Sequence, residues 1–364
     1  MAEDIEQEDI WEDDEPEQDE VSTAPVERLR FIAEKGLVPL RIDKHLMKRL
    51  EGATRNKVQQ ALDEGHILVN GSVVKANYKI KPGDEVVIFE TRKAELNEVL
   101  PENIPLEIAY EDKDMMIVNK PAGMVVHPGC GNYTGTLVNA LAYHLEQEHV
   151  DTHNLYRVGL VHRIDKDTTG LVVIAKTEGA MTNLSAQFKK HTVYRRYIAL
   201  VWGDMEEDDG TVHVNVGRHL RFRKIMDTFP EDDYGKDAIT HYKVLERFNY
   251  VTLLELRLET GRTHQIRVHM KHIGHPLFND ATYGGDRIIK GTVFTKYKQF
   301  VENCFKILPR HALHAKELGV VHPVTGVSMR FDSNLPDDMA QVIEKWRAYI
   351  NGMTKQLKEK LDNK

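Results

Sequence analysis

Strand-like runs in the second half of the chain constrain the fold more than any other feature. They cluster in neighbouring pairs, and helix-like runs do not follow each strand in a regular repeat. Such pairs favour antiparallel connections, so we predict an α+β fold with a mixed, mainly antiparallel sheet and helices packed on it. The strand-like runs are 106–110, 115–119, 171–175, 194–202, 240–245 and 251–258, and the helix-like runs are 137–145, 179–190 and 263–273.

Two stretches, 204–238 and 284–310, interrupt this pattern, and we expect them to be loop insertions. The first holds a basic cluster, which is either solvated surface or a loop that grips RNA. The cluster consists of Arg218, Arg221, Arg223 and Lys224. An amphipathic helix over 337–349 is predicted to close the fold.

Residues 39–90 form a separate pattern of two short helices and a small sheet. Ile42, Leu46 and Leu50 recur at helical spacing, and after a break the spacing continues to Gly65. Asn70-Gly71 between two apolar runs predicts a two-residue hairpin, and a further strand is expected over 85–89. The polar stretch 91–105 then reads as a linker.

Net charge is misleading until it is divided along the chain. The 364 residues carry a formal charge of −8, but residues 1–20 hold twelve acids and no base, leaving 45 acids against 49 bases elsewhere. Residues 1–25 therefore have the composition of a disordered acidic tail, either a solubilising segment or a decoy that covers a basic RNA-binding groove.

Two cysteines are too few for a disulfide framework and no Cys-x-x-Cys is present, so a reducing cytoplasm is the expected location. The longest apolar run is six residues, 197–202, where a membrane span needs about 20, and the start of the chain has no signal-peptide pattern. These features argue against membrane insertion.

Basic residues on or beside the two N-terminal helices are candidates for contact with phosphates. We select Arg49, Arg55 and Lys57, although nearby acids dilute the patch and most such helix faces are merely solvated. The string "RNKVQQALDEGHILVNGSVVKANYKIKPGDEVVI" resembles the alpha-L RNA-binding module, the S-four type of ribosomal-protein domain. That resemblance implies an RNA-binding domain over 39–90.

The string 162–170, His-Arg-Ile-Asp-Lys-Asp-Thr-Thr-Gly, leads directly into a predicted strand. A polar loop held by a rigid strand is a suitable place for a catalytic site, but a salt-bridged turn has the same composition. Spacing alone does not decide between Asp165 and Asp167.

"HRIDKDTTGLVVIAK" resembles the catalytic motif of the RluA-type ribosomal-RNA pseudouridine synthases, with Ile164 in place of the usual leucine. Four further strings resemble successive blocks of the same family across about 104–332: "LEIAYEDKDMMIVNKPAGMVVHP", "YRRYIALVWG", "TGRTHQIRVHMKHIGHPLFND" and "ALHAKELGVVHPVTG". The resemblance implies a catalytic domain over 106–335, followed by a C-terminal helix and tail over 336–364. It also implies isomerisation of specific uridines in large-subunit ribosomal RNA, without a cofactor.

By the same resemblance, Asp165 is the catalytic carboxylate, which attacks ribose carbon 1′ or removes the proton at carbon 2′. Tyr197 stacks on the target base, and Arg267 pairs with Asp165. Arg163 fills the space left by the extracted base. Arg262, five residues before Arg267, falls in a different helical direction and is expected to contact backbone or phosphate. Two more residues of the motif, His162 and Thr168, are expected to contact RNA.

Several histidines suggest a rival chemistry, because imidazoles are common metal ligands. They are His264, His269, His272, His275, His311 and His314. Only His269 and His272 share a helix face, and no acid follows in a known ligand pattern, so we expect no metal site. A silent RNA-binding assembly factor on the same scaffold is the alternative function, against which the intact Asp165, Tyr197 and Arg267 argue. Ribosomal RNA is the one partner that the sequence implies; it identifies no protein partner.

Overall fold

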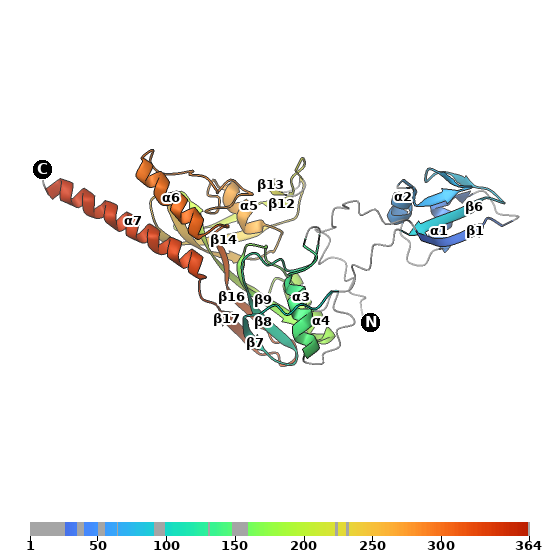
Figure 1. Ribbon diagram of the computed structural model, residues 1–364, viewed down its shortest axis with the longest axis horizontal. Helices are drawn as coiled ribbons and strands as arrows, with labels where there is room; N and C mark the ends of the chain where they lie inside the picture. Colours follow the sequence, from blue (N-terminus) through green and yellow to red (C-terminus); the bar gives the residue numbers. More distant parts are fainter. Residues whose placement is uncertain are drawn as a thin grey trace. The chain divides into compact units, whose positions relative to one another are not determined.

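The structure is a computed structural model that describes residues 26–34, 40–49, 55–63, 65–90, 99–129, 132–147, 159–222, 225–230 and 233–362. The described residues belong to two units, one ending before Val99 and one running from Val99 onward (Figure 1). The acidic segment 1–25 and residues 91–98 of the predicted linker lie outside these ranges. The remainder of that linker belongs to the second unit, where Val99 and Ile104 pack against its core.

The N-terminal unit has two helices and a small sheet, as the sequence predicts. The strands β1, β6, β3 and β4 form one sheet in that order, and β2 pairs with β5. The elements are β1 (Val26–Ile32), β2 (Leu40–Arg41), α1 (Ile42–Arg49), α2 (Arg55–Asp63), β3 (Ile67–Val69), β4 (Ser72–Val73), β5 (Lys79–Ile80) and β6 (Glu85–Glu90).

The core of this unit forms where the two predicted periodicities meet. Ile42 and Leu46 of α1 are fully buried together with Leu62 of α2, because residues three or four apart share a helix face. Asn70 and Gly71 have φ values of +50° and +75°, which a tight hairpin requires and which these two residue types adopt at low cost. The predicted hairpin is therefore confirmed.

Strand β1 was not expected from the sequence. It pairs antiparallel with β6, with a register shift between Glu27 and Leu29. The shift and the charged residues around it break the apolar alternation by which a strand is recognised.

The second unit is built on a nine-stranded sheet with the order β11-β14-β15-β10-β16-β9-β8-β7, and β17 pairs with β16 beside this path. All neighbours are antiparallel except β9 and β16, so the predicted α+β fold with a mixed, mainly antiparallel sheet is confirmed. The elements are β7 (Ile108–Glu111), β8 (Met115–Lys120), α3 (Leu137–Gln147), β9 (Thr169–Ala175), α4 (Glu178–Lys189), β10 (Tyr194–Trp202), β11 (Asp209–His213), β12 (Asn215–Arg218), β13 (Met226–Phe229), β14 (Ile239–Arg247), β15 (Val251–Leu258), α5 (Gln265–His272), α6 (Thr295–Ile307), β16 (Leu313–Val321), β17 (Ser328–Asp332) and α7 (Asp337–Asp362).

Both faces of the central strands are covered, and alternate residues of each strand enter different cores. In β10, Tyr197 and Ala199 belong to the core that contains residues of α3 and α5. Ile198 and Leu200 point the other way, into a core with α6 and α7. Figure 1 shows α6 and α7 side by side and the C-terminal end of α7 extending past the other elements of this unit.

The stretches 204–238 and 284–310 are not plain loop insertions, so that prediction was wrong. The first contains β11, β12 and β13 and the second contains α6. In β11 only Val212 is buried, which leaves an edge strand with a polar sequence. In α6, Tyr297, Val301 and Cys304 give a buried stripe at helical spacing that a basic, aromatic sequence obscured.

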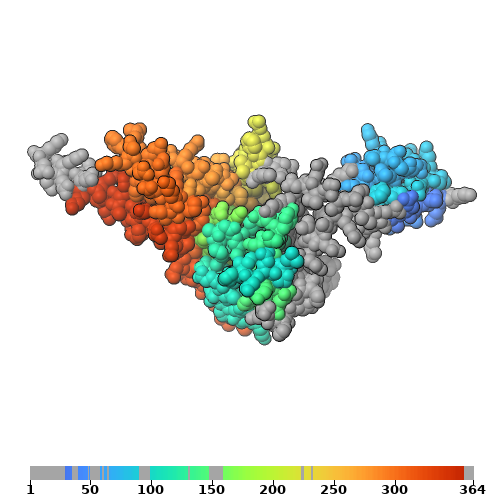
Figure 2. Space-filling model, in the orientation of Figure 1, coloured from blue at the N-terminus to red at the C-terminus, as the bar shows by residue number. Residues whose placement is uncertain are grey.

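The β12–β13 hairpin projects from the surface of the second unit, where it is seen in yellow in Figure 2. Leu220 and Phe222 lie near its tip and are largely exposed. Helix α7 is longer than the predicted 337–349 and ends at Asp362. Across the described ranges, no helix has both the length and the apolar character that crossing a membrane would require.

Candidate active site

The polar loop 162–168 enters β9 at a point where the backbone packs tightly against β16. Gly170 has φ +117°, and a Cβ atom there would lie 2.2 Å from the carbonyl oxygen of Ala315 on β16. Only glycine fits this approach, because β9 and β16 run parallel and in contact at this residue. The Thr-Thr-Gly end of the motif therefore fixes the loop against the sheet.

Two buried cations hold the backbone of the same loop. Lys120 Nζ donates to the carbonyl of Lys166 at 2.9 Å, and to two further carbonyls at 2.8 Å. Arg310 Nη1 donates to the carbonyl of Asp167 at 3.0 Å. Burial lowers the pKa of Lys120 to about 7, although Asp165 and Asp167 oppose the change. Sequence reasoning missed both cations, because neither lies in the loop that it holds.

Asp165, Arg267 and Asp280 form a buried ionic row. Arg267 binds Asp280 through two bonds, Nε to Oδ2 at 2.7 Å and Nη2 to Oδ1 at 2.9 Å. Its remaining nitrogen, Nη1, reaches Oδ2 of Asp165 at 3.0 Å. The side chains of Asp280 and Arg267 are 0% and 6% exposed, whereas that of Asp165 is 21% exposed. The predicted pairing of Asp165 with Arg267 is present, and Asp280 is the unforeseen residue that aims the arginine.

The electrostatics of this row keep Asp165 ionised. Burial tends to raise the pKa of the Asp165 carboxyl, but His264, Arg267 and His311 outweigh burial, and the pKa lies below its ordinary range. Burial also opposes the charge of Arg267, but the two carboxylates raise its pKa above the ordinary value. Because burial lowers the pKa values of both histidines, Arg267 is the permanent cation of the three.

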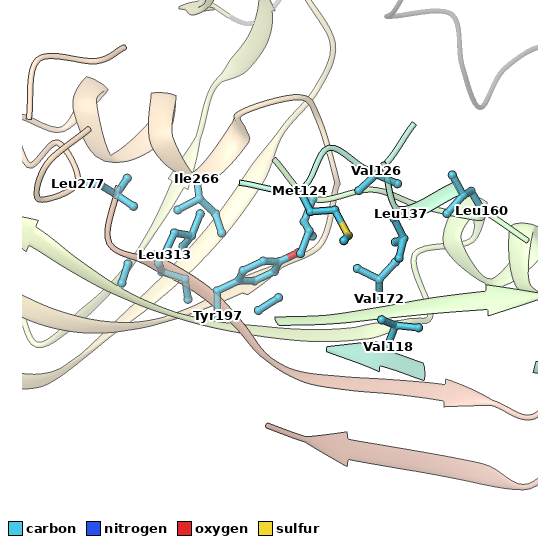
Figure 3. Close-up of a cluster of buried hydrophobic side chains, with 14 of the residues drawn as sticks. Val118, Met124, Val126, Leu137, Leu160, Val172, Tyr197, Ile266, Leu277 and Leu313 are labelled. Carbon is cyan, nitrogen blue, oxygen red and sulfur yellow. The ribbon is translucent and has the colours of Figure 1, made fainter. Parts of the chain in front are cut away.

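Tyr197 stands on β10 beside a register shift in the pairing with β16, a type of irregularity that redirects side chains near sites. Its ring lies between Leu313 and Met124, with the hydroxyl end pointing toward Met124 (Figure 3). Burial raises the pKa of Tyr197, and Asp165 raises it further against the effect of Arg195. The side chain is thus both part of a core and part of the wall of the site.

A single pocket of about 310 Å³ collects every site residue that the sequence predicted in the second unit. Its volume is at the lower end of the range for small-ligand sites. The residues are Asp165, Tyr197, Arg267, Arg163, Arg262, His162 and Thr168. They come from the loop before β9, from β10 and from the start of α5, segments that are distant in the sequence.

The four predicted RNA contacts differ in their surroundings. Arg163 is exposed, and Arg262 is half-buried with Nε donating to the carbonyl of Asp237 at 3.0 Å. His162 Nε2 accepts the backbone N–H of Val173 at 3.0 Å, and its ring stacks on Phe188. Burial lowers the pKa of His162 to about 3. An RNA contact by His162 remains a prediction.

Thr168 is almost completely buried, and its hydroxyl hydrogen-bonds Nε2 of His311 at 2.8 Å. Its neighbour Thr169 binds Nδ1 of His314 at 2.9 Å in the same way. These bonds attach the loop to β16 and to the segment before it. The RNA contact proposed for Thr168 also remains a prediction.

The remaining predicted RNA-binding residues belong to the N-terminal unit. Arg49 is exposed, and its guanidinium lies 4.4 Å from the centre of the Phe31 ring. Arg55 and Lys57 are in α2, but their side chains are outside the described part of the structure.

The histidines that suggested a metal site have separate partners. His269 uses both ring nitrogens, with Thr240 Oγ1 at 2.9 Å and the carbonyl of Val214 at 3.1 Å. His272 and His275 bind a threonine hydroxyl and a backbone carbonyl. These three histidines therefore serve as hydrogen-bonding groups in the folded protein.

One other group in the described part of the chain, Asp112, Asp114 and His322, brings three atoms of metal-ligand type within 4.8 Å of one another. His322 Nε2 and the Tyr110 hydroxyl already bind Oδ2 of Asp112 at 2.7 Å each, and backbone N–H groups bind its other oxygen. This arrangement closes a turn and lies apart from the pocket residues.

Comparison with known proteins finds relatives of both units. Residues 114–272 match the family described as RNA pseudouridylate synthase, and residues 40–86 match the S4 domain. An uncharacterized RNA pseudouridine synthase of Chlorobaculum parvum is 46% identical over 315 residues, covering 86% of this chain and 95% of the relative. The ribosomal large subunit pseudouridine synthase D of Escherichia coli K12 is 42% identical over 313 residues, covering 85% of this chain and 91% of the relative.

Among solved structures, human RNA pseudouridylate synthase domain containing 4 aligns with a TM-score of 0.50 at 24% identity, over 66% of this chain and 92% of that one. This likeness supports the fold of the second unit.

Proposed function

The chain belongs to the RluA-type RNA pseudouridine synthases and carries an S4 domain, and from this premise we propose that it converts specific uridines of large-subunit ribosomal RNA to pseudouridine. Membership makes it an isomerase that acts on RNA. The choice of ribosomal RNA rests on relatives such as the Escherichia coli enzyme, whose name includes the ribosomal large subunit. The cytoplasm is the location we propose for the reaction.

One observation carries the assignment of Asp165 as the catalytic carboxylate. Arg267 holds its Oδ2 at 3.0 Å, its Oδ1 has no hydrogen-bond partner among the described residues, and the side chain lines the pocket. The low pKa of the carboxyl keeps it ionised at neutral pH. A fixed and charged carboxylate that lines a pocket and has one oxygen without a protein hydrogen bond is suited to attack on a sugar carbon or to proton removal.

The reaction exchanges one glycosidic bond for another. The bond between ribose carbon 1′ and base nitrogen 1 breaks, and carbon 5 of the base joins carbon 1′. Carbon 5 loses a proton and nitrogen 1 gains one, so atoms balance and no electrons leave the nucleotide. Asp165 either bonds to carbon 1′ as the base departs or takes the proton at carbon 2′, and the geometry is compatible with both.

Tyr197 and Arg163 serve the base in this proposal. Because burial and the charge of Asp165 raise the pKa of Tyr197, its phenol is neutral in the resting enzyme, which favours stacking before any proton removal. Extracting a uridine from the RNA stack costs a few kcal/mol. Arg163, exposed beside the pocket, offers a planar cation that fills the vacated space.

Pseudouridine mapping in ribosomal RNA from a deletion strain tests the substrate, with complementation by the wild-type gene and by an Asp165→Asn gene. We expect one or more large-subunit sites to disappear and only the wild-type gene to restore them. Retention of every large-subunit site would contradict the substrate, and restoration by Asp165→Asn would contradict the catalytic assignment.

A further inference from the structure

A third side chain, His264, faces the open oxygen of Asp165. His264 precedes α5 with φ +54°, a left-handed conformation that is uncommon outside glycine. Its Nε2 lies 3.9 Å from Oδ1 of Asp165, beyond hydrogen-bond distance, and its side chain is 21% exposed in the wall of the pocket. The backbone strain and the open nitrogen together suggest a side chain that is positioned for a substrate.

A hydrogen-bond chain behind the ring decides which nitrogen carries the proton. The backbone N–H of Met226 donates to the Tyr283 hydroxyl oxygen at 3.1 Å. That hydroxyl lies 2.8 Å from His264 Nδ1, and in the described chain this nitrogen is the acceptor available to its proton. Nδ1 therefore accepts, and a neutral imidazole must hold its proton on Nε2.

Tyr283, which binds His264, also contacts Arg267 and its partner Asp280. The ring of Tyr283 lies 5.0 Å below the guanidinium of Arg267, and its backbone N–H donates to Oδ1 of Asp280. Burial lowers the pKa of His264, which keeps the ring neutral beside these charges. The result is a preset N–H donor that points into the space beside Oδ1 of Asp165.

We propose that His264 Nε2 donates a hydrogen bond to the 2′-hydroxyl oxygen of the target ribose and so orients the sugar against Asp165 Oδ1. The inference rests on the proposed role of Asp165. Whether this oxygen acts at carbon 1′ or at the carbon 2′ proton, the 2′-oxygen must lie close to it. At a separation of 3.9 Å, one hydroxyl can accept from the histidine and donate to the carboxylate.

A phosphate oxygen is the competing acceptor of the same chemistry. It would bring an anion to an ionised carboxylate, which charge repulsion disfavours. A hydroxyl avoids this repulsion, because it can donate its own proton to Asp165. The geometry and charge therefore favour the 2′-hydroxyl as the occupant.

Two substitutions of His264 separate the two ring nitrogens. In His264→Asn the amide reaches only the position of Nδ1, so the contact with Tyr283 is kept and the donor at Nε2 is lost. In His264→Gln an amide N–H reaches the position of Nε2. We expect the single-turnover rate to fall about 5- to 10-fold in His264→Asn, the value of one hydrogen bond, and to recover at least half of that loss in His264→Gln. Thermal melting identifies any variant that does not fold.

The substrate arm uses a short RNA that contains the uridine located by the mapping, or the same RNA with 2′-deoxyuridine at that position. If the histidine binds the 2′-oxygen, wild-type enzyme loses rate on the deoxy RNA and His264→Asn loses nothing further. RNA affinities are also measured for Asp165→Asn with and without His264→Asn, on both RNAs. The Asp165→Asn substitution prevents turnover, and binding does not require it. The proposal would be overturned if His264→Asn lowered the rate equally on both RNAs. It would also be overturned if His264→Asn turned over the ribose RNA as fast as the wild-type enzyme does.

The Asp165→Asn protein distinguishes this failure from that of the proposed function. If Asp165→Asn is inactive and His264→Asn behaves like wild type, only the role of His264 is wrong. If Asp165→Asn retains turnover, the catalytic assignment itself fails.

Discussion

The two units treat buried aspartates in opposite ways. In the N-terminal unit, Asp84 accepts hydrogen bonds on both carboxylate oxygens, from Asn70, from the Tyr78 hydroxyl and from the backbone N–H of Lys81. In the catalytic unit, Asp165 lines a pocket, with Oδ2 bound to Arg267 and Oδ1 without a hydrogen-bond partner among the described residues. Partners outweigh burial and lower the pKa of both. A low pKa therefore does not distinguish a structural aspartate from a catalytic one. The carboxylate oxygen that has no hydrogen-bond partner in the described chain does.

The largest expected effect comes from removing the charge of the catalytic aspartate. Asp165→Asn removes the reactive charge with almost no change in shape, so we expect turnover to fall by at least about 10³-fold while RNA affinity changes little. Asp167→Asn is the matched control, since Asp167 enters the site through its carbonyl, which accepts from Arg310. A comparable loss in the control would show that the wrong acid was chosen. Single-turnover assays and RNA binding measure the two quantities.

Substitution of Asp280 tests whether Arg267 needs its second carboxylate partner to position Asp165. Asp280→Asn leaves a buried cation with only one carboxylate, which we expect to cost about 3–5 kcal/mol of stability and to slow turnover about 100-fold in the fraction that remains folded. Asp208→Asn is the matched control, because Asp208 pairs with Arg247 at 2.6 Å but its side chain is 85% exposed. Thermal melting should separate the two, and equal melting temperatures would mean that the buried pair does not organise the site.

Asp84 gives the structural counterpart. Asp84→Asn should destabilise the N-terminal unit by about 1–3 kcal/mol and leave the catalytic step unchanged in rate, because its partners are all internal. The folded-state pKa of Asp84 is depressed, so its contribution is present above the unfolded pKa and is lost as pH falls through the folded value. Urea unfolding of both proteins at neutral and strongly acidic pH should show the difference disappearing in acid. A difference that persists in acid would contradict the account.

Structural features that depend on neighbouring residues were predicted well from local sequence patterns. Asn70-Gly71 predicted its hairpin, and the strand-like run 194–202 predicted β10, because turn chemistry and strand composition are local properties. Asp165, Tyr197 and Arg267 were selected through the family resemblance, and the structure places them in one pocket.

Partners distant in the sequence escaped prediction. Lys120 reaches the loop from 46 residues away, and Asp280 acts on Asp165 only through Arg267. His162 and Thr168, whose RNA contacts remain predictions, use polar atoms to attach the loop to β9 and to His311. A loop sequence does not show which of its polar groups are used inside the protein.

Charges of the N-terminal unit should act collectively. We expect deletion of residues 1–98 to weaken affinity for structured ribosomal RNA about 10-fold and to flatten the salt dependence, by about 0.7–0.9 in the log–log slope for each lost phosphate contact. Arg49→Gln alone should change affinity much less, because Arg49 is one exposed cation among several. Filter binding across a salt series measures both. An unchanged slope after the deletion would mean that this unit does not touch RNA.

The smallest expected effect concerns residues 1–25, whose twelve acids precede a basic RNA-binding unit in the sequence. If these acids compete with RNA for arginine and lysine side chains, their removal should speed association with non-cognate RNA about 2-fold, most clearly at low salt where screening is least. Cognate turnover should change less, because the correct RNA also gains stacking and base contacts that a carboxylate cannot displace. Residues 1–364 and 26–364 are compared on cognate and scrambled RNA across a salt series. If both proteins discriminate equally between cognate and scrambled RNA at every salt concentration, the segment is a solubilising tail. The contrast between the two units would then not involve residues 1–25.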